Sequence, residues 1–337
     1  MIGRYFAYRL ALAIPSMFIL LTVVFVILRI IPGNPIEALV GQKAPPEYVK
    51  QLMAQAGLDK PLYVQYFDYI RGIFTGNLGV SFIDNRPVIA EIMDRFPATV
   101  ELAVASFLVS ILIGHALAFL GAYFRGRIDE AVRLYAIIAY VLFIPFFGLA
   151  LQLLFGVYLR LLPIGGRITP GLEPPRITGL YTVDALLTGD WPALASAVEH
   201  LLLPSITLGV VISGIFTRFI RNNIVKTLEE DFILAYKAAG MGRAGVLLRA
   251  YRAAIVPTVT MMGLQLALLL QGAVLTETTF SWPGVGTLLL ERIQNLDYPT
   301  VQGIVVFFVL IVVLINIIVD FVNALVDPRL RRGLWRS

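Results

Sequence analysis

The sequence predicts an all-α integral membrane protein with six transmembrane helices. Of 337 residues, 58% are hydrophobic and 15% are charged, whereas soluble domains carry roughly 25% charged residues. The mean hydropathy of +0.82 cannot come from one anchor, because a single span accounts for only about 20 residues. Lipid leaves backbone polar groups unsatisfied, so each span must be a helix. The apolar runs long enough to cross are 10–31, 98–122, 134–159, 201–220, 256–279 and 301–326.

The first apolar run, 10–31, contains one charged residue, Arg29. A signal peptide has an apolar core of only about 7–15 residues, so we interpret the run as a retained helix. Residues 1–31 then form an N-terminal tail and the first span. Proline marks three later runs, with Pro145 inside the third and Pro204 and Pro257 near the starts of the fourth and fifth. Kinks are expected there, because neighbouring helices can satisfy the freed carbonyl groups.

Basic residues at the ends of the apolar runs indicate the orientation. With the N-terminus in the cytoplasm, the loops 123–133 and 221–255 and the tail 327–337 fall on one side. These are the strongly basic short segments, as the positive-inside rule expects. Both termini are therefore predicted to be cytoplasmic in a multi-pass protein of the cell membrane. The net charge of +5 does not indicate nucleic-acid binding, because no basic face with interleaved exposed aromatic residues is present.

Two long segments are predicted on the external side. Segment 32–97 is long enough to be translocated whatever its charge, and its apolar residues predict a small ordered subdomain. Segment 160–200 is rich in proline and glycine and is predicted to be mostly loop with short helical pieces. Residues 98–326 then form a five-helix membrane core that includes the loop 221–255. The residues expected to pack the external subdomain are Leu52, Leu58, Leu62, Tyr66, Phe67, Ile70 and Phe74.

The sequence offers little material for catalysis. It has no cysteine and two histidines, which excludes disulfides and thiolate sites and leaves few metal ligands. A Gly-x-x-x-x-Gly-Lys-Ser/Thr phosphate loop is absent, so the chain is not expected to bind ATP. No clustered nucleophile or carboxylate pair supports a membrane enzyme. We interpret His115 as a packing residue and His200 as an anchor at a helix start.

The loop 221–255 contains a predicted short helix at 231–240. Acidic residues at its start, ending in Asp231, are favoured by the helix dipole, and Gly240 suits its end. A small, apolar helix in the cytosol fits either a protein partner or the lipid headgroups, and composition leaves both open. The residues expected on its exposed surface are Phe232, Ile233, Ala235, Tyr236, Ala238 and Ala239.

Polar residues inside the spans are candidates for a transport path. Gln265, Gln271 and Thr278 lie on the fifth span, and the last two share one face because they are seven residues apart. Hydrogen bonding between helices is the alternative for each. On the last span, Asn316, Asp320 and Asn323 form a polar stripe that we interpret as structural. Asp320 is expected to pair with Arg218 or Arg221, while Trp282 and Pro283 are expected at the outer interface, where indoles settle.

The segment Ala235–Gly240, followed by Pro257, resembles the cytoplasmic loop of ABC importer permeases. That loop carries a Glu-Ala-Ala-x-x-x-Gly motif which docks on the ATPase subunit. The match departs from the motif at Leu234, which replaces the glutamate, and at Tyr236, which replaces the second alanine. Further segments resemble the oligopeptide, dipeptide and nickel branch of the family: Leu28–Pro35, Gly57–Leu62, Gln65–Tyr66, Gly76–Gly79, Arg95–Thr99, Thr276–Gly286, Asp297–Pro299, Gln302–Gly303 and Asp327–Arg329.

The resemblance implies the permease subunit of a type I ABC importer. Such a subunit pairs with a second, homologous permease, receives solute from an external binding protein and is driven by two cytoplasmic ATPases. ATP and Mg²⁺ then belong to those partners, and this chain is neither an enzyme nor a cofactor protein. The implied substrates are peptides, nickel complexes or oligosaccharides. The residues assigned to the ATPase contact are Asp231, Phe232, Ala235, Tyr236, Lys237, Ala238, Ala239, Gly240 and Arg243.

A secondary transporter or channel that acts without ATP is the alternative from another class. It requires titratable or ion-coordinating groups within the spans. The sequence offers only His115, Glu277 and Asp320 for that role.

Overall fold

The computed structural model describes residues 14–27, 45–55, 57–124 and 126–326. Within these ranges the fold is helical, with one isolated antiparallel bridge between Val80 and Pro87. An N-terminal helix covers Ile14–Ile27. The other helices are α3 (Pro46–Gln55), α4 (Leu62–Phe74), α5 (Val88–Tyr123), α6 (Arg127–Val141), α7 (Ile144–Leu151), a π-helix (Gln152–Tyr158), α8 (Tyr181–Thr188), α9 (Trp191–Thr227), α10 (Asp231–Ala238), α11 (Arg243–Thr279), α12 (Val285–Gln294) and α13 (Tyr298–Val326).

The prediction of an all-helical membrane fold is confirmed. Helices α5 and α9 and the part Tyr298–Val319 of α13 are long and apolar enough to span a bilayer, and α6 with α7 forms a fourth candidate. The fifth predicted span lies within α11. The count of six stays a prediction, because residues 1–13, 28–44 and 327–337 lie outside the described ranges. The segments Leu28–Pro35 and Asp327–Arg329 belong to those parts of the chain.

The third predicted span, 134–159, is wrong as a continuous helix. Helices α6 and α7 are separate and meet at 103°. The break falls at Leu142 and Phe143, directly before Ile144 and Pro145 at the start of α7. Proline lacks an amide hydrogen and its ring clashes with the carbonyl four residues before it, which here belongs to Val141 at the end of α6, and proline favours a helix start. Pro145 therefore starts a new helix instead of kinking an existing one.

The spanning helices are longer than the predicted apolar runs. Helix α5 begins at Val88, so the last residues of the predicted external segment 32–97 form its first turns, with Pro97 inside the helix. Helix α9 begins at Trp191 and takes up the end of segment 160–200. His200 consequently lies within α9, which corrects its predicted place at a helix start. Its Nδ1 lies 2.8 Å from the carbonyl oxygen of Ser196.

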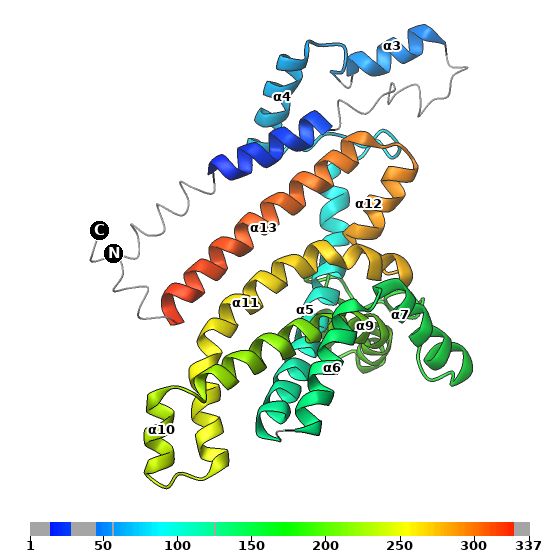
Figure 1. Ribbon diagram of the computed structural model, residues 1–337. Helices are drawn as coiled ribbons and strands as arrows, with labels where there is room; N and C mark the ends of the chain where they lie inside the picture. The colour runs from blue at the N-terminus through cyan, green and yellow to red at the C-terminus, as the bar shows by residue number, and fades with distance from the viewer. Residues whose placement is uncertain (1–13, 28–44, 56, 125, 327–337) are drawn as a thin grey trace.

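The two ends of the molecule are formed by different helices. Helices α3, α4 and α12 lie at one end, and α10 lies at the other, beside the end of α5 and the start of α6 (Figure 1). The chain segments predicted to be cytoplasmic, 123–133 and 221–255, therefore gather at one end of the bundle. This grouping agrees with the orientation that the basic residues predict.

Glycines allow the membrane helices to approach closely. A Cβ atom at Gly209 of α9 would lie 2.6 Å from Val109 Cγ1 and 3.0 Å from the carbonyl oxygen of Ser106, both on α5. At Gly214 it would lie 2.8 Å from the carbonyl oxygen of Ala136 on α6. Membrane helices associate through packing of small residues, since lipid is as apolar as their side chains. Helix α9 is thus fixed between α5 and α6.

We predict that Gly209→Ala lowers thermal stability in detergent. The added methyl group has no room, and overpacking costs about 1–3 kcal/mol. Gly242→Ala is the control, because a Cβ there meets nothing within 4 Å. Equal melting temperatures for the two variants would contradict the close packing of α5 and α9.

Candidate functional site

Helix α10 confirms the predicted short helix and its stop. It runs Asp231–Ala238, with Asp231 in the first turn. Gly240 has φ +78°, a left-handed conformation that glycine adopts without steric cost. The amide of Gly240 donates to Lys237 O (3.0 Å), and the amide of Met241 donates to Tyr236 O (3.1 Å). These two bonds form a complete Schellman motif, which reverses the chain at a fixed residue.

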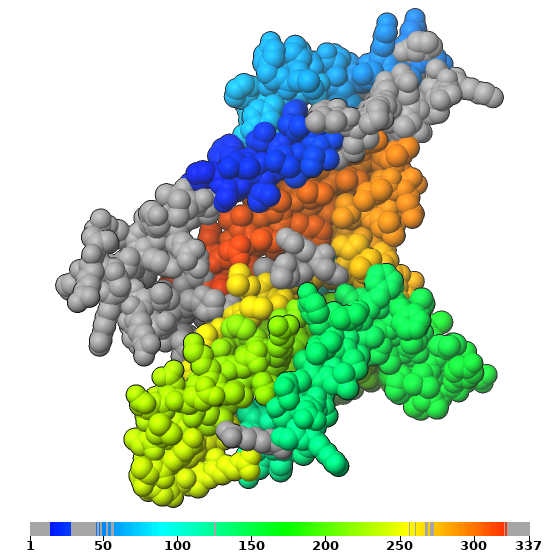
Figure 2. All heavy atoms as spheres, viewed as in Figure 1, coloured from blue at the N-terminus to red at the C-terminus, as the bar shows by residue number. Residues whose placement is uncertain are grey.

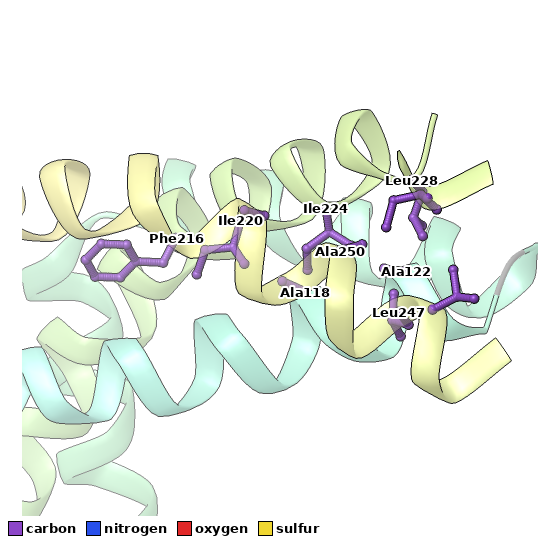
Figure 3. Close-up of a cluster of buried hydrophobic side chains, with 11 residues drawn as sticks. Ala118, Ala122, Phe216, Ile220, Ile224, Leu228, Leu247 and Ala250 are labelled. Atoms are coloured by element: carbon purple, nitrogen blue, oxygen red, sulfur yellow. The ribbon is translucent and has the colours of Figure 1, made fainter. Parts of the chain in front are cut away.

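A set of buried apolar residues, here the α10 cluster, attaches α10 to the helix bundle. It joins the ends of α5, α9 and α11 around Ile233, which is 0% exposed. Tyr236 and Met241 pack against it, so the Schellman turn also contributes apolar contact. Figure 3 shows side chains from all three long helices directed toward one another. The α10 cluster consists of Ala118, Ala122, Phe216, Ile220, Ile224, Leu228, Ile233, Val246, Leu247, Ala250 and Ala254.

The prediction that Ile233 is exposed is wrong. An isolated eight-residue amphipathic helix is unstable in water, and the burial of an isoleucine stabilises it by about 1.5–3 kcal/mol. The outward surface of α10 nevertheless remains apolar: Phe232 is 46% and Leu234 is 51% exposed. In the space-filling view, α10 and the adjoining parts of α9 and α11 form a lobe at one end of the molecule (Figure 2). The small exposed residues of this surface are Ala235, Ala238 and Ala239.

A cavity of about 590 Å³ lies beside α10, between it and the ends of α5 and α11. Lys237 and Arg243 line it, together with Tyr123. The Arg243 guanidinium donates to the carbonyl oxygen of Tyr123 and lies 5.2 Å from the centre of its ring. Lys237 Nζ lies 3.4 Å from Leu228 O. Both cations thus brace the loop through backbone carbonyls of neighbouring helices.

An ion pair beneath the loop joins α6 to α9. Arg221 Nε donates to Asp129 Oδ1 (2.5 Å) and Arg221 Nη2 to Asp129 Oδ2 (2.7 Å), with the side chains only 16% and 14% exposed. Asp129 thus accepts along one edge of the Arg221 guanidinium, and the pairing of Asp320 with Arg218 or Arg221 stays a prediction. The side chain of Asp320 lies outside the described residues.

The predicted path residues are not brought together in the described part of the chain. Gln265 is buried at 6% exposure, while the Thr278 hydroxyl donates to Leu275 O of its own helix (3.0 Å). Asn316 is exposed. The side chains of Gln271 and Asn323 lie outside the described residues. The rings of His115 and Tyr251 meet edge to face, with their centres 6.0 Å apart, in agreement with a packing role.

Buried hydroxyls on three helices were missed by the sequence reasoning. The hydroxyls of Ser106 on α5, Thr217 on α9 and Thr276 on α11 have no hydrogen-bond partner among the described residues. Serine and threonine are common in spans and usually bond to their own helix, so no sequence signal marks these three. They keep hydrogen-bonding capacity inside the bundle.

At the opposite end, Trp282 corrects the prediction of an interfacial indole. It is 0% exposed, and its Nε1 donates to Ala98 O (2.8 Å). Next to it, Glu277 accepts from the Thr99 hydroxyl (2.7 Å) and from the Thr287 amide (3.0 Å). A Cβ at Gly284 would lie 2.2 Å from the Glu277 carboxylate. The segment Thr276–Gly286 therefore locks the turn between α11 and α12 onto α5.

A buried ion pair holds the segment before α8 on α5. Arg167 Nη2 lies 2.7 Å from Glu101 Oε2, and the two side chains are 8% and 4% exposed. The second carboxylate oxygen accepts from the Thr182 amide (2.8 Å) and hydroxyl (2.7 Å). The guanidinium also lies 3.8 Å from the ring centre of Tyr181. A buried pair with its remaining groups satisfied fixes one geometry.

The turn before α8 is closed by Asp184. Its carboxylate accepts from the amides of Ile177, Thr178 and Gly179 and from the Thr178 hydroxyl. Burial alone would raise the pKa of Asp184, but these hydrogen bonds hold that pKa below its usual value. Much of segment 160–190 is thus ordered through polar side chains rather than through an apolar core.

These features define a helical membrane protein with a short helix, α10, whose outer surface is apolar, at one end and an ordered cap at the other. Two family descriptions match the chain. Residues 106–332 match "Binding-protein-dependent transport system inner membrane component". Residues 1–103 match "Binding-prot-dependent transport system membrane comp, N-term". The chain belongs to this family of inner-membrane transport components and is an ABC importer permease.

Curated relatives cover almost the whole chain. It is 42% identical over 314 residues to the probable D,D-dipeptide transport system permease protein DdpB of Escherichia coli (strain K12), covering 92% of each chain. It is 37% identical over 330 residues to the di/tripeptide transport system permease protein DppB of Pseudomonas aeruginosa (strain UCBPP-PA14), covering 97% and 98%. It is 33% identical over 330 residues to the glutathione transport system permease protein GsiC of Salmonella choleraesuis (strain SC-B67), covering 97% and 99%.

We predict that Asp129→Ala and Arg221→Ala each lower stability by about 1–3 kcal/mol, because each leaves a partly buried charge without its partner. The double variant loses less than the sum of the two. Melting temperatures in detergent measure this. Arg133→Ala is the control, since Arg133 is 54% exposed and lies 3.5 Å from the same carboxylate, so its loss costs under about 0.5 kcal/mol. Additive losses would show that the pair is not coupled.

Proposed function

We propose that this chain forms the membrane-spanning half of an ATP-driven importer for short peptides. The three relatives compared above are named for D,D-dipeptide, di/tripeptide and glutathione transport. All three solutes are small and built from amide bonds. This supports peptides over the nickel complexes and oligosaccharides that the wider family resemblance allows. The other half of the pathway is a second, homologous permease, and an external binding protein delivers the solute.

The observation that carries the proposal is the apolar outer surface of α10. Phe232 and Leu234 are exposed next to a row of alanines, and small residues let another backbone approach closely. Exposed apolar surface in water indicates a protein or membrane contact. The rigid Schellman stop and the burial of Ile233 suit a helix that transmits force. We assign this surface to a cytoplasmic ATPase, which holds the ATP and Mg²⁺.

The proposed orientation places both termini, α10 and the loop 123–133 in the cytoplasm. The clustering of α10 with the end of α5 at one end of the bundle supports this. The rival interpretation, in which α10 lies on lipid headgroups, also accounts for an apolar surface, but it predicts no loss of ATPase stimulation when the end of α10 is shifted. A transporter that works without ATP requires ionisable groups along the path. Of its three candidates, His115 packs against Tyr251 and Glu277 is bonded to Thr99.

Gly240 provides the test of coupling. Gly240→Val places a β-branched residue at φ +78°, which costs about 1–2 kcal/mol and shifts the helix end. Peptide uptake and ATPase stimulation in proteoliposomes containing the complete transporter are expected to fall by about tenfold or more. Gly240→Asn is the matched variant, because asparagine tolerates this conformation, and it is expected to stay near the wild type.

Both variants must reach the membrane in equal amounts, which detergent-solubilised yield and melting temperature measure. A Cβ at Gly240 meets nothing within 4 Å, so the effect is not a steric clash. Unchanged uptake in Gly240→Val, or uptake by the purified chain without an ATPase, would refute the assignment.

A further inference from the structure

The end of α11 that lies away from α10 is completed by groups from a distant part of the chain. The last carbonyl groups of a helix have no partner within it. The side-chain amide of Gln152 donates to the carbonyl oxygen of Thr279, the last residue of α11 (3.0 Å). The backbone amide of Gly166 donates to the carbonyl oxygen of Phe280, the next residue (2.9 Å). Two donors from outside α11 therefore cap it.

Both donors belong to one folded unit, here called the α7 hairpin. It covers residues 144–166 and consists of α7, the π-helix and a returning loop. Gln152 Nε2 carries two hydrogens, and it also donates to Ile164 O in the returning loop (2.6 Å). A Cβ at Gly156 would overlap Ile164 Cγ2, so glycine allows the loop to approach the π-helix. π-Helices are rare and occur frequently at functional sites.

Glycines also bring the α7 hairpin against the end of α11. A Cβ at Gly148 would lie 3.0 Å from Phe280 Cε2 and 3.1 Å from Thr279 Cγ2. A Cβ at Gly165 would lie 2.7 Å from Phe280 O. In Figure 1, α7 lies beside the end of α11 that is remote from α10. The hairpin is thus held on α11 by close packing as well as by hydrogen bonds.

The connection of the α7 hairpin to α6 is a sharp break. The two helices meet at 103°, and Leu142 and Phe143 between them lie outside both helices. A few such residues are enough to form a hinge. The start of α6 is fixed to α9 by the pair of Asp129 and Arg221. Helix α7 also contacts α9, but the capping hydrogen bonds of the hairpin go to the end of α11.

Helix α11 connects the α7 hairpin to α10. Only Met241 and Gly242 separate the Schellman glycine, Gly240, from the first residue of α11. The helix has 37 residues and continues through Pro257, so it is about 55 Å long at 1.5 Å per residue. A displacement of the end of α10 therefore acts directly on the start of α11, and the hairpin lies at its other end.

We propose that Gln152 is a positioning residue for transport, which keeps the α7 hairpin on α11 while α11 moves. A displacement of α10 by the ATPase then reaches the external side as a movement of the hairpin. The direction of this drive rests on the proposed function. The joint movement of the hairpin and α11 rests on the contacts described above.

A disulfide cross-link tests the joint movement. The chain has no cysteine, so Gly148→Cys and Thr279→Cys introduce a single pair. Thr279 Cγ2 lies 3.1 Å from the Cβ position at residue 148, and in a disulfide each Cβ lies about 3 Å from the sulfur of the other cysteine. In the complete transporter, the oxidised pair is expected to take up peptide as the reduced pair does. Uptake that stops on oxidation and returns with reductant would overturn the proposal, because α7 and α11 would then have to separate.

The variant Gln152→Met tests the hydrogen bonds, because methionine keeps the length of the side chain and removes its donors. Peptide uptake in proteoliposomes is expected to fall by about tenfold, while the amount of assembled complex stays the same. Gln294→Met changes an exposed glutamine of α12 and is the control. Oxidation of the cysteine pair in the Gln152→Met chain is expected to restore uptake, which a role in folding alone does not predict.

Unchanged uptake in Gln152→Met, or uptake that the cross-link fails to restore, would contradict the role of Gln152. Failure of the proposed function gives a different result, in which the wild-type complex takes up no peptide. The yield of the cross-link needs no transport assay, and it is expected to be equal with and without ATP. A yield that falls when ATP is added would show that α7 leaves α11 and would overturn the inference on its own.

Discussion

The attachment of α10 to the bundle is the constraint on which the rest of the account depends. An eight-residue helix in water has no stability of its own, and here it is held by the burial of Ile233 between the ends of three long helices. The hydrophobic effect is strong but nondirectional, so it does not fix the orientation of α10 on the bundle. That orientation is fixed by the Schellman turn at Gly240 and by the hydrogen bonds of Lys237 and Arg243 to backbone carbonyls of neighbouring helices.

The two ends of the molecule are stabilised by different kinds of interaction. At the end of α10 an apolar cluster holds the helix, and Phe232 and Leu234 on its outer surface are exposed. At the other end, buried polar groups fix the chain: Glu277 on Thr99, Arg167 on Glu101 and Trp282 on Ala98. Hydrogen bonds and ion pairs in a low-dielectric setting are costly to break singly. This end is therefore held in one geometry.

The sequence predicts those elements whose cause is local. Hydropathy gives most of the spans, and the acidic start and glycine stop give α10 with its correct end. Contacts between distant residues leave no such trace. Nothing near Asp129 indicates that it pairs with Arg221, 92 residues away, and the apolar neighbours of Trp282 resemble those of an interfacial indole. The break before Pro145 was marked by the proline itself, although its full effect depends on the path of the next helix.

The segment 32–97 shows a second limit of sequence reasoning. Its apolar residues are those of a small packed subdomain, yet Phe67 and Phe74 are exposed. Periodicity places residues on one side of a helix but does not say what covers that side. For α10 the sequence leaves the same ambiguity, between lipid and protein.

The most direct test is a pair of cryo-EM structures of the complete transporter, one without nucleotide and one trapped with ATP. If α10 transmits force through the α10 cluster, Ile233 keeps its place among Ile224, Leu247 and Ala250 in both states. Helix α10 then moves as one body with the ends of α5, α9 and α11. An α10 that slides out of the cluster while those helix ends stay fixed would contradict the account.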